Sequence, residues 1–423
     1  MALLLKIGRL LDPSRSLDAT LDLRIENGRV SQIGLALEAS GSDTLDLRGL
    51  VVAPGFIDMH VHLREPGKEE AETILTGTRA AAAGGFTAVA CMPNTSPVND
   101  SVSMTDFILH RAAETARVKV YPIAAVTEKQ LGETLAPMEE LKGAGVVAFS
   151  DDGRPVVNSL LMRQALERAA ALDLPVIDHC EDPNLFRGGA MHEGKVSSRL
   201  AIRGIPGAAE EIMVARNIIL SKMTGAQVHM AHMSTAGSMQ LIRRAKQDGI
   251  RVTAEVTPHH FALTDEAVAR YGTNAKMNPP LRTALDVDAM LEAIADGTVD
   301  VIASDHAPHH EQTKNVEFHD AAFGIVGLET SVSLGLDRLV HSEVISLARF
   351  VELYSINPAR ILHMERGIYE GAEANLTIFH PTRQVTIRAE EFQSKSQNTP
   401  FDGWTLHGAP AHTICKGELI WGK

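Results

Sequence analysis

One stretch, residues 51–65, constrains the fold of this chain more than any other. It begins as an apolar strand and ends in the alternating pattern His60-Val-His62-Leu-Arg64. In an extended chain, side chains two residues apart lie on one face, so we expect the two imidazoles and the guanidinium to project together. Two histidines at this spacing suit a zinc-type ion, and an arginine beside them suits a carboxylate. The alternative is a polar strand end with solvated histidines.

Seven further apolar segments follow, and each leaves room for a helix before the next. They are residues 86–94, 118–126, 145–152, 174–180, 227–234, 250–256 and 299–306, with helical segments at 71–83 and 159–172 between them. This alternation is typical of βαβ units, and eight strands predict an α/β fold, a (β/α)₈ TIM barrel. Several strands end in His, Asp, Asn or Arg. A parallel barrel brings such strand ends to one face.

Both ends of the chain have a different pattern. Residues 21–26 alternate with period two before the turn signal Asn27-Gly28, and residues 375–379 and 384–388 alternate again near the C-terminus. We predict a last strand around residues 413–421. The two ends are expected to pair into one small β-sandwich domain. The predicted domains are therefore residues 1–54 and 366–423 for the β domain and 55–365 for the barrel.

Composition limits the partners of the chain. A formal net charge of -13 argues against nucleic acid or an anionic membrane surface as the main partner. The three cysteines are too few and too scattered for a disulfide framework, which favours a reducing cytoplasm. The apolar start of the chain is too short for a signal sequence, and no apolar run approaches a membrane span. We expect a soluble cytoplasmic protein that acts on a small molecule.

Candidate metal ligands gather at the predicted strand ends. They are His60, His62, the pair Asp151-Asp152, His179, His229 or His232, and Asp305. A lone histidine is more often a core or surface group, but these share a strand position as well as a residue type. His229 and His232 face opposite sides of a strand, so only one is expected to point inward. Asp151 and Asp152 are also opposed, and the pattern alone does not select between them.

These motifs together resemble the amidohydrolase superfamily and, more narrowly, the type I bacterial dihydroorotases. The motifs at residues 60–64, 178–181, 229–234 and 304–309 carry the resemblance to the superfamily. The resemblance to the dihydroorotases covers essentially the whole chain, with close and fairly specific matches at residues 55–67, 92–95 and 276–282. It implies the reversible cyclisation of N-carbamoyl-L-aspartate to L-dihydroorotate in de novo pyrimidine (UMP) biosynthesis.

The resemblance also implies a ligand set. One zinc ion is expected on His60, His62 and Asp305, and a second position on His179 and His232 with Asp152 between them, giving one or two Zn²⁺ per chain. Zinc lowers the pKa of bound water from about 16 to about 7, which supplies a hydroxide nucleophile. Asp305 is expected to act as general base and acid, the alternative being a role as ligand alone.

Substrate contacts are implied in the same way. Arg64 and Asn94 are expected to hold the dihydroorotate carboxylate, beside His62. Asn278 and His309 belong to the implied pocket, and the backbone at Phe323 and Gly324 is expected to meet the ring. The bland alternatives are a turn at Asn94, an extended loop at Asn278 and a solvated loop at His309. The loop from residue 309 to 327 is expected to close over substrate.

Two other functions compete with this one. Hydantoinases and many relatives bridge their metals with a carboxylated lysine at the fourth strand, but residues 146–154 contain no lysine. This absence argues against a hydantoinase- or allantoinase-like enzyme. The second alternative is a non-catalytic dihydroorotase-like partner of aspartate transcarbamoylase. All six ligand positions are filled, which argues against this alternative. We also expect a homo-oligomer and consider a complex with aspartate transcarbamoylase.

Overall fold

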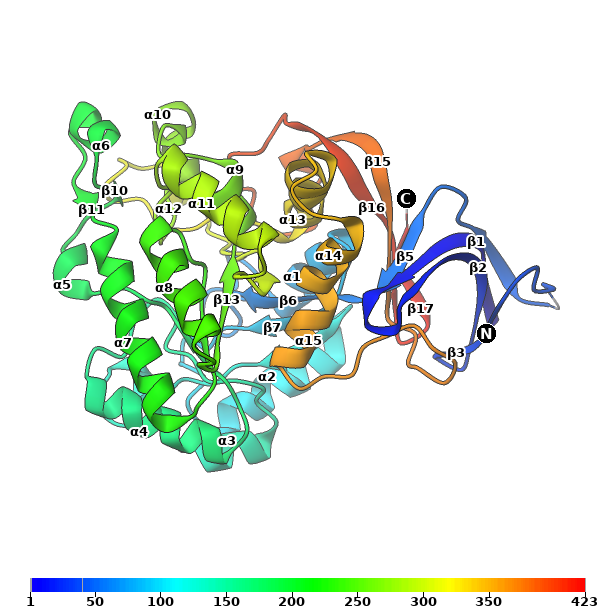
Figure 1. Cartoon of the computed structure of the whole chain (residues 1–423), viewed down its shortest axis with the longest axis horizontal. Coiled ribbons are helices and arrows are strands. Elements are labelled where there is room, and N and C mark those ends of the chain that lie inside the picture. Colours follow the sequence, from blue (N-terminus) through cyan, green and yellow to red (C-terminus); the bar gives the residue numbers. More distant parts are fainter. Residues whose placement is uncertain (1, 40, 423) are drawn as a thin grey trace.

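The computed structural model describes residues 2–39 and 41–422, which form an α/β region and a sheet built from both chain ends (Figure 1). The terminal sheet has the strand order β17-β16-β15-β5-β1-β2-β3, and β4 pairs with β1. Its strands are β1 (Ala2–Asp12), β2 (Leu17–Glu26), β3 (Arg29–Gly34), β4 (Asp43–Asp46), β5 (Val51–Pro54), β15 (Leu376–Thr386), β16 (Thr405–Cys415) and β17 (Glu418–Gly422). Segments from opposite ends of the sequence thus lie side by side.

Local sequence accounts for much of this sheet. Asn27 and Gly28 both have positive φ, 51° and 78°, and join β2 to β3 in the predicted hairpin. Alternating apolar residues from β1, β2, β5, β15 and β16 form one core cluster within the sheet. The predicted strand at 413–421 is wrong in one respect. Lys416 and Gly417 have φ of 51° and 82° and divide this stretch between β16 and β17, which pair with each other.

The opening stretch also divides. Gly55 separates β5, which belongs to the terminal sheet, from β6 (Phe56–Val61), which belongs to the α/β region. A Cβ on Gly55 would lie 2.2 Å from Oγ1 of Thr87, so a side chain does not fit where the chain passes between the two sheets. A single continuous strand is therefore replaced by two short strands with different partners.

Parallel strands form the centre of the α/β region. One set pairs in the order β6-β7-β8 and another in the order β14-β13-β12-β9. The added bounds are β7 (Phe86–Cys91), β8 (Lys119–Pro122), β9 (Val176–Asp178), β12 (Val228–Met230), β13 (Val252–Val256) and β14 (Val301–Ile302). Isolated parallel bridges join the sets at Ala124–Phe149, Phe149–Val176 and Val61–His306. The predicted fourth strand at 145–152 is reduced to the two bridges of Phe149.

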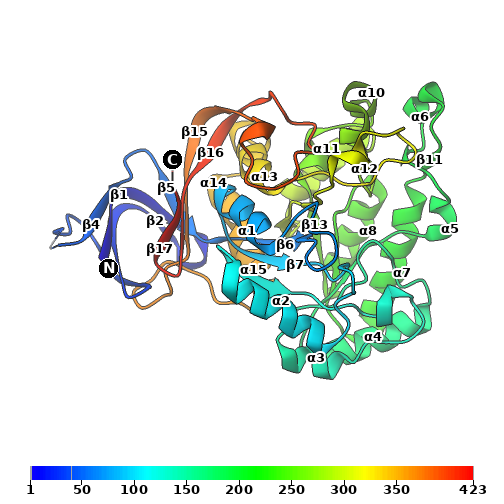
Figure 2. The ribbon, with the colours of Figure 1, turned by 180° about the vertical axis from the view of Figure 1, so that it is seen from behind.

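Helices surround these strands in both views (Figures 1 and 2). They are α1 (Ile74–Ala83), α2 (Val102–Thr115), α3 (Met138–Ala144), α4 (Ser159–Ala171), α5 (Pro183–Phe186), α6 (Lys195–Leu200), α7 (Ala208–Thr224), α8 (Ala236–Gln247), α9 (Pro258–Ala262), α10 (Ala267–Tyr271), α11 (Ala284–Ala295), α12 (Glu311–Lys314), α13 (Leu328–Gly335), α14 (Leu347–Val351) and α15 (Asn357–Ile361). A small parallel pair, β10 (Met191–His192) and β11 (Gly204–Ile205), lies near α5 and α6. Within the described residues, no helix is both long and apolar enough to span a membrane.

A cluster of aromatic side chains lies between the α/β region and the terminal sheet. The ring of Phe56 on β6 packs 5.8 Å from Phe350, 5.5 Å from Tyr354 and 5.8 Å from Phe379, the last of which belongs to β15. All four side chains are fully buried. Aromatic side chains bury large apolar areas, so this cluster is a major link between the two parts of the chain.

The segment between β15 and β16 leaves the terminal sheet and packs on the α/β region. In Figure 2 it extends from these strands toward the loop that carries α12. Ser394 donates to the buried carboxylate of Glu72, and Asn398 donates to the backbone oxygens of Ala307 and Gly324. Residues near the C-terminus therefore contact the loops around the strand ends.

Candidate active site

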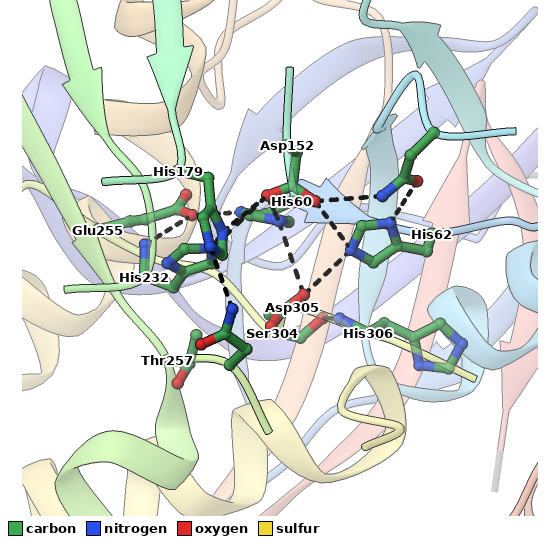
Figure 3. Close-up of polar contacts among 12 residues, drawn as sticks. His60, His62, Asp152, His179, His232, Glu255, Thr257, Ser304, Asp305 and His306 are labelled. Atoms are coloured by element: carbon green, nitrogen blue, oxygen red, sulfur yellow. Dashed lines mark hydrogen bonds and ion pairs between the residues drawn. The ribbon is translucent and has the colours of Figure 1, made fainter. Parts of the chain in front are cut away.

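The predicted ligands meet at the C-terminal ends of the parallel strands (Figure 3). His60 lies in β6 and His62 just after it, while His179, His232 and Asp305 follow the ends of β9, β12 and β14. Asp152 comes from the stretch after Phe149. All six residues are at most 6% exposed. The strand ends thus bring together residues that are far apart in sequence.

His60, His62 and Asp305 form one compact group. Nε2 of His62 lies 3.2 Å from Oδ1 of Asp305, and Nε2 of His60 lies 3.6 Å from the same oxygen. One donor atom from each residue falls within 4.8 Å of the others, a spacing that can hold a metal ion. Two imidazoles and a carboxylate are donors that a zinc-type ion accepts.

Asp152 is the centre of the second group. Its Oδ1 lies 3.4 Å from Nε2 of His60, 3.6 Å from Nδ1 of His179 and 3.5 Å from Nε2 of His232. Its Oδ2 lies 3.5 Å from Nε2 of His62. His60, Asp152 and His232 satisfy the same spacing for a metal ion. This carboxylate therefore faces both groups of histidines.

Two orphaned atoms test whether these residues fit a metal. Nε2 of His60 and Oδ1 of Asp152 are buried, and neither forms a hydrogen bond within the part of the chain that the structure describes. A buried polar atom without a partner is costly, typically by about 1–3 kcal/mol. A metal ion bound between these atoms removes that cost, so the donor set fits a zinc-type ion.

Glu255 on β13 orients the site and was not predicted. Its Oε1 lies 2.6 Å from Nδ1 of His60 and accepts a hydrogen bond from the backbone N of His232 at 3.2 Å, and its Oε2 lies 3.1 Å from Nε2 of His229. Burial opposes ionisation, but the charge of His60 and the hydrogen bond from His229 outweigh it and lower the pKa of Glu255 to about 2. A proton on Nδ1 of His60 leaves Nε2 free for a metal. The only signal in the sequence is a lone acid in an apolar strand.

Both candidate metal-binding carboxylates stay ionised. Burial raises the pKa of Asp305, but the hydrogen bond from His62 and the charge of His60 more than offset it and hold this pKa below the ordinary value. Burial acts in the same direction on Asp152, where the charge of His60 and the nearby imidazole of His179 lower the pKa well below the usual range. Two ionised carboxylates among four imidazoles favour a bound cation.

Three residues of the site have a left-handed backbone. Arg64, His232 and Asp305 have φ of 60°, 36° and 46°. Residues other than glycine adopt this region at a cost of about 1–3 kcal/mol, and such residues cluster at functional sites. Because of this backbone conformation, these side chains point in directions that the alternating pattern of a strand does not predict.

A pocket of about 620 Å³ opens above the metal-binding residues. All the predicted substrate-binding residues line it: His62, Arg64, Asn94, Asn278, His309, Phe323 and Gly324. Gln130, Arg154, Glu181 and Phe186 also line it and were not predicted. Glu181 accepts a hydrogen bond from Nδ2 of Asn278 at 3.1 Å, and its Oε2 lies 3.6 Å from Nε2 of His179.

Arg64 and Asn94 supply polar groups to this pocket. Burial lowers the pKa of Arg64, but only to about 10, so the guanidinium stays charged. Its Nε donates to the backbone oxygen of Pro308 at 3.1 Å. Oδ1 of Asn94 lies 2.9 Å from Nδ1 of His62, and its Nδ2 donates to Asp152 at 3.3 Å. A buried guanidinium beside an amide is suited to a carboxylate.

His309 is a neutral imidazole in the pocket wall. Burial and the charge of Arg64 lower its pKa to about 2. Its Nε2 lies 2.6 Å from the backbone oxygen of Phe323, to which it donates. The ring of Phe323 lies 6.0 Å from that of Phe186. The two ends of this loop, at His309 and Phe323, therefore form part of the pocket wall, whereas most residues between 311 and 320 are exposed.

Several other polar residues near these strand ends lie outside the group of ligands. Asp151 turns away and accepts hydrogen bonds from the backbone of Val126 and Thr127 at 2.8 and 3.1 Å. His229 faces Glu255, and the buried thiol of Cys180 contacts Met230. His259 and His260 belong to α9, where Nε2 of His260 donates to the backbone oxygen of Pro279. Of the two opposed pairs, Asp152 and His232 are the members that lie in the ligand group, with Oδ1 of Asp152 3.5 Å from Nε2 of His232.

Curated relatives and a family model place the chain in the dihydroorotase family. A family model described as dihydro-orotase-like matches residues 49–238. A dihydroorotase from Geobacter metallireducens is 51% identical over 425 residues, which cover 100% of both chains, and one from Pelotomaculum thermopropionicum is 53% identical over 421 residues, covering 99% of this chain and 98% of the relative. Among solved structures, an L-hydantoinase (dihydropyrimidinase) from Arthrobacter aurescens is 24% identical with a TM-score of 0.89, covering 100% of this chain and 96% of its own. That likeness shows a shared fold.

Proposed function

Because the chain belongs to the dihydroorotase family, we propose that it interconverts N-carbamoyl-L-aspartate and L-dihydroorotate in the de novo synthesis of pyrimidines. The observation that carries this proposal is that about half of the residues are identical to those of dihydroorotases over the full length of the chain. Four imidazoles and two carboxylates around one pocket supply what the hydrolysis of a cyclic amide needs. The reaction closes and opens a six-membered ring.

Zinc is the metal that we assign to the two groups of ligands, with one or two ions per chain. His60, His62 and Asp305 would hold one ion, and His179, His232 and the shared Asp152 the other. The supporting observations are the short distances among these atoms and the two orphaned atoms between them. When bound, such an ion acidifies water and polarises a carbonyl oxygen.

Asp305 is the proposed general base and acid. Its carboxylate is ionised and borders the pocket, so it can accept a proton from the attacking water. It then returns the proton to the ring nitrogen as the amide bond breaks, and in ring closure the proton moves the other way. Nε2 of His62 lies 3.2 Å from this carboxylate, and both would be ligands of the same ion.

Substrate is held by polar groups that line the same pocket. The Arg64 guanidinium and the Asn94 amide bind the carboxylate of dihydroorotate, beside His62. Asn278 and His309 contact the polar atoms of the ring, and the backbone at Phe323 and Gly324 borders it. All these residues line one pocket, and Arg64 is charged there.

The finer description of the fold is also a proposal. The parallel strands form a closed (β/α)₈ barrel, supported by the three isolated bridges. The barrel spans residues 55–365, and the segments 1–54 and 366–423 form a small β-sandwich domain, supported by the change of sheet at Gly55. The three unpaired cysteines suit a cytoplasmic location. Assembly as a homo-oligomer and a complex with aspartate transcarbamoylase stay predictions, which gel filtration with and without that partner tests.

One experiment tests the function and the role of Asp305. The purified chain is assayed for ring opening with dihydroorotate, hydantoin and allantoin, alongside the variant Asp305→Ala, with zinc content and circular dichroism measured on both. We expect dihydroorotate alone to be hydrolysed, and the folded variant to lose this activity. Hydrolysis of hydantoin in place of dihydroorotate would favour the hydantoinase alternative, and an inactive wild-type chain with bound zinc would favour the non-catalytic one. Undiminished turnover in the variant would contradict the role of Asp305.

A further inference from the structure

The peptide of Gly324 in the pocket wall is held from several directions. Its N–H donates to the backbone oxygen of Lys276 at 2.9 Å. Its oxygen accepts hydrogen bonds from Nζ of Lys314 at 2.9 Å and from Nδ2 of Asn398 at 3.1 Å. Its φ is 121°, and a Cβ would lie 2.5 Å from that of Ala307, so only glycine fits. The position of this part of the wall therefore depends on Lys314 and Asn398.

Lys314, at the end of α12, is a buried cation whose hydrogen-bond partners are backbone oxygens. Its Nζ lies 2.9 Å from the oxygens of Ala322 and Gly324 and 3.3 Å from that of Lys276. An ammonium group has three N–H donors, which matches these three acceptors. The side chain is 4% exposed, and burying a charge is unfavourable unless it is well hydrogen-bonded. This arrangement ties the loop after β14 to the segment that carries Asn278.

Asn398 comes from the segment between β15 and β16 and uses both ends of its amide. Nδ2 donates to the oxygens of Ala307 and Gly324, each at 3.1 Å, and Oδ1 accepts from the backbone N of His309 at 3.2 Å. Its backbone oxygen accepts from the N of Val326 at 3.0 Å. One buried side chain thus holds both ends of the loop that forms the wall, at residues 307–309 and at Gly324.

Both side chains lie behind the wall rather than in the pocket. Lys314 and Asn398 line a second cavity of about 390 Å³, and neither borders the pocket of about 620 Å³. His309 lines both cavities and separates them. Any effect of Lys314 or Asn398 on substrate is therefore indirect and passes through the backbone that they hold, chiefly at Gly324, Ala307 and His309.

We propose that Lys314 and Asn398 are positioning residues, a clamp that holds the Gly324 peptide and His309 where the dihydroorotate ring binds. The inference rests on the proposed function. The clamp acts on residues that contact the ring and not on the metal ligands. Its loss should therefore weaken substrate binding while leaving the chemical step and the metal content largely unchanged.

The test compares four variants with matched controls. Lys314→Met removes all three donors at similar length, Lys314→Gln retains an amide donor, and Asn398→Ala removes both ends of the amide. The fourth variant combines Lys314→Met with Asn398→Ala. Lys222→Met, on the exposed face of α7, and Gln397→Ala, next to Asn398 and exposed, are the controls. Ring opening releases a proton, so ring closure of N-carbamoyl-L-aspartate at pH 6.5 is the practical assay.

We expect KM to rise about tenfold in Lys314→Met and in Asn398→Ala, because the loss of a charged or doubly bonded donor is worth roughly one power of ten. Lys314→Gln should show an intermediate rise, and kcat and zinc content should stay close to wild type. The double variant should fall short of the product of the single effects, because both side chains hold one peptide. Both controls should match the wild type.

Two results would overturn the proposal. One is an active wild type whose KM is unchanged in Lys314→Gln and Asn398→Ala, the milder variants that remain informative if Lys314→Met does not fold. The other is a parallel fall of kcat and zinc content, which would mean a general structural role. A wild type without activity on carbamoyl aspartate would instead refute the proposed function and, with it, the clamp.

Discussion

Glu255 offers the sharpest test of how the metal site is organised. Its carboxylate faces three donors: Nδ1 of His60 at 2.6 Å, the backbone N of His232 at 3.2 Å and Nε2 of His229 at 3.1 Å. The first two lie on Oε1 and the third on Oε2. Replacing Glu255 by Gln keeps the shape and the first two contacts, and replacing it by Ala removes all three.

The structure sets different magnitudes for the two variants. In Glu255→Gln the new NH₂ group faces His229, which can accept at Nε2 if its Nδ1 donates instead to Oγ1 of Thr253, 2.9 Å away. Only the charge is then lost, and since ionic hydrogen bonds are roughly twice as strong as neutral ones, we expect zinc affinity to fall about tenfold. Glu255→Ala leaves buried donors on His60 and His229 unpaired, so a fall of about 100-fold is expected.

Competition with a chromogenic zinc chelator at pH 7.5 measures the Kd of each variant, and circular dichroism checks that each is folded. Glu139→Gln, an exposed position on α3, is the control and should bind zinc like the wild type. Equal zinc affinity in the wild type and Glu255→Ala would refute the view that this carboxylate orients His60.

Three further predictions concern metal, pH and packing. Dialysis against a chelator should abolish ring opening and lower the melting temperature, because a metal that binds only the folded chain stabilises it, and added zinc should restore both; full activity after dialysis would exclude a metal requirement. Burial and the nearby charge of Lys276 lower the pKa of Lys314 to about 7, so above that pH the folded chain has released a proton that the unfolded chain keeps until about pH 10.4. The stability of the wild type relative to Lys314→Met should therefore rise between pH 7 and 9, by up to about 1.4 kcal/mol per unit, and stay constant below pH 7; parallel melting temperatures across this range would contradict it. Phe56→Ala should cost about 3–5 kcal/mol, seen as a lower melting temperature with unchanged KM, whereas an unchanged melting temperature would mean that the aromatic cluster does not stabilise the link between the two regions.

Strand periodicity explains part of what the sequence predicted and also its limits. It placed His229 and His232 on opposite faces but could not say which one faces the metal site. The structure shows why: β12 ends at Met230, and His232 lies beyond it with φ of 36°, so alternation no longer sets its direction. The same holds for Asp305, with φ of 46° after β14. Those assignments came from resemblance to a family.

Other residues depended on contacts that no local pattern contains. Glu255 lies within a strand, so a prediction based on polar residues at strand ends does not include it. Lys314 and Asn398 act through backbone oxygens of distant segments, and the sequence has no signature for such hydrogen bonds. The break at Gly55 had a visible glycine, but its meaning depends on Thr87, which approaches from another strand. Periodicity therefore finds the strands, and packing decides where they stop.

The terminal sheet has a consequence for how the chain emerges from the ribosome. β5 is made long before its antiparallel neighbour β15. Until then one edge of β5 has open hydrogen-bonding groups, the kind of edge on which nascent chains associate wrongly. The metal ligands can assemble earlier, since the last of them is Asp305, whereas the wall behind the substrate must wait for Asn398. A chain interrupted before Asn398 would therefore contain all six proposed metal ligands but lack a support of the pocket wall.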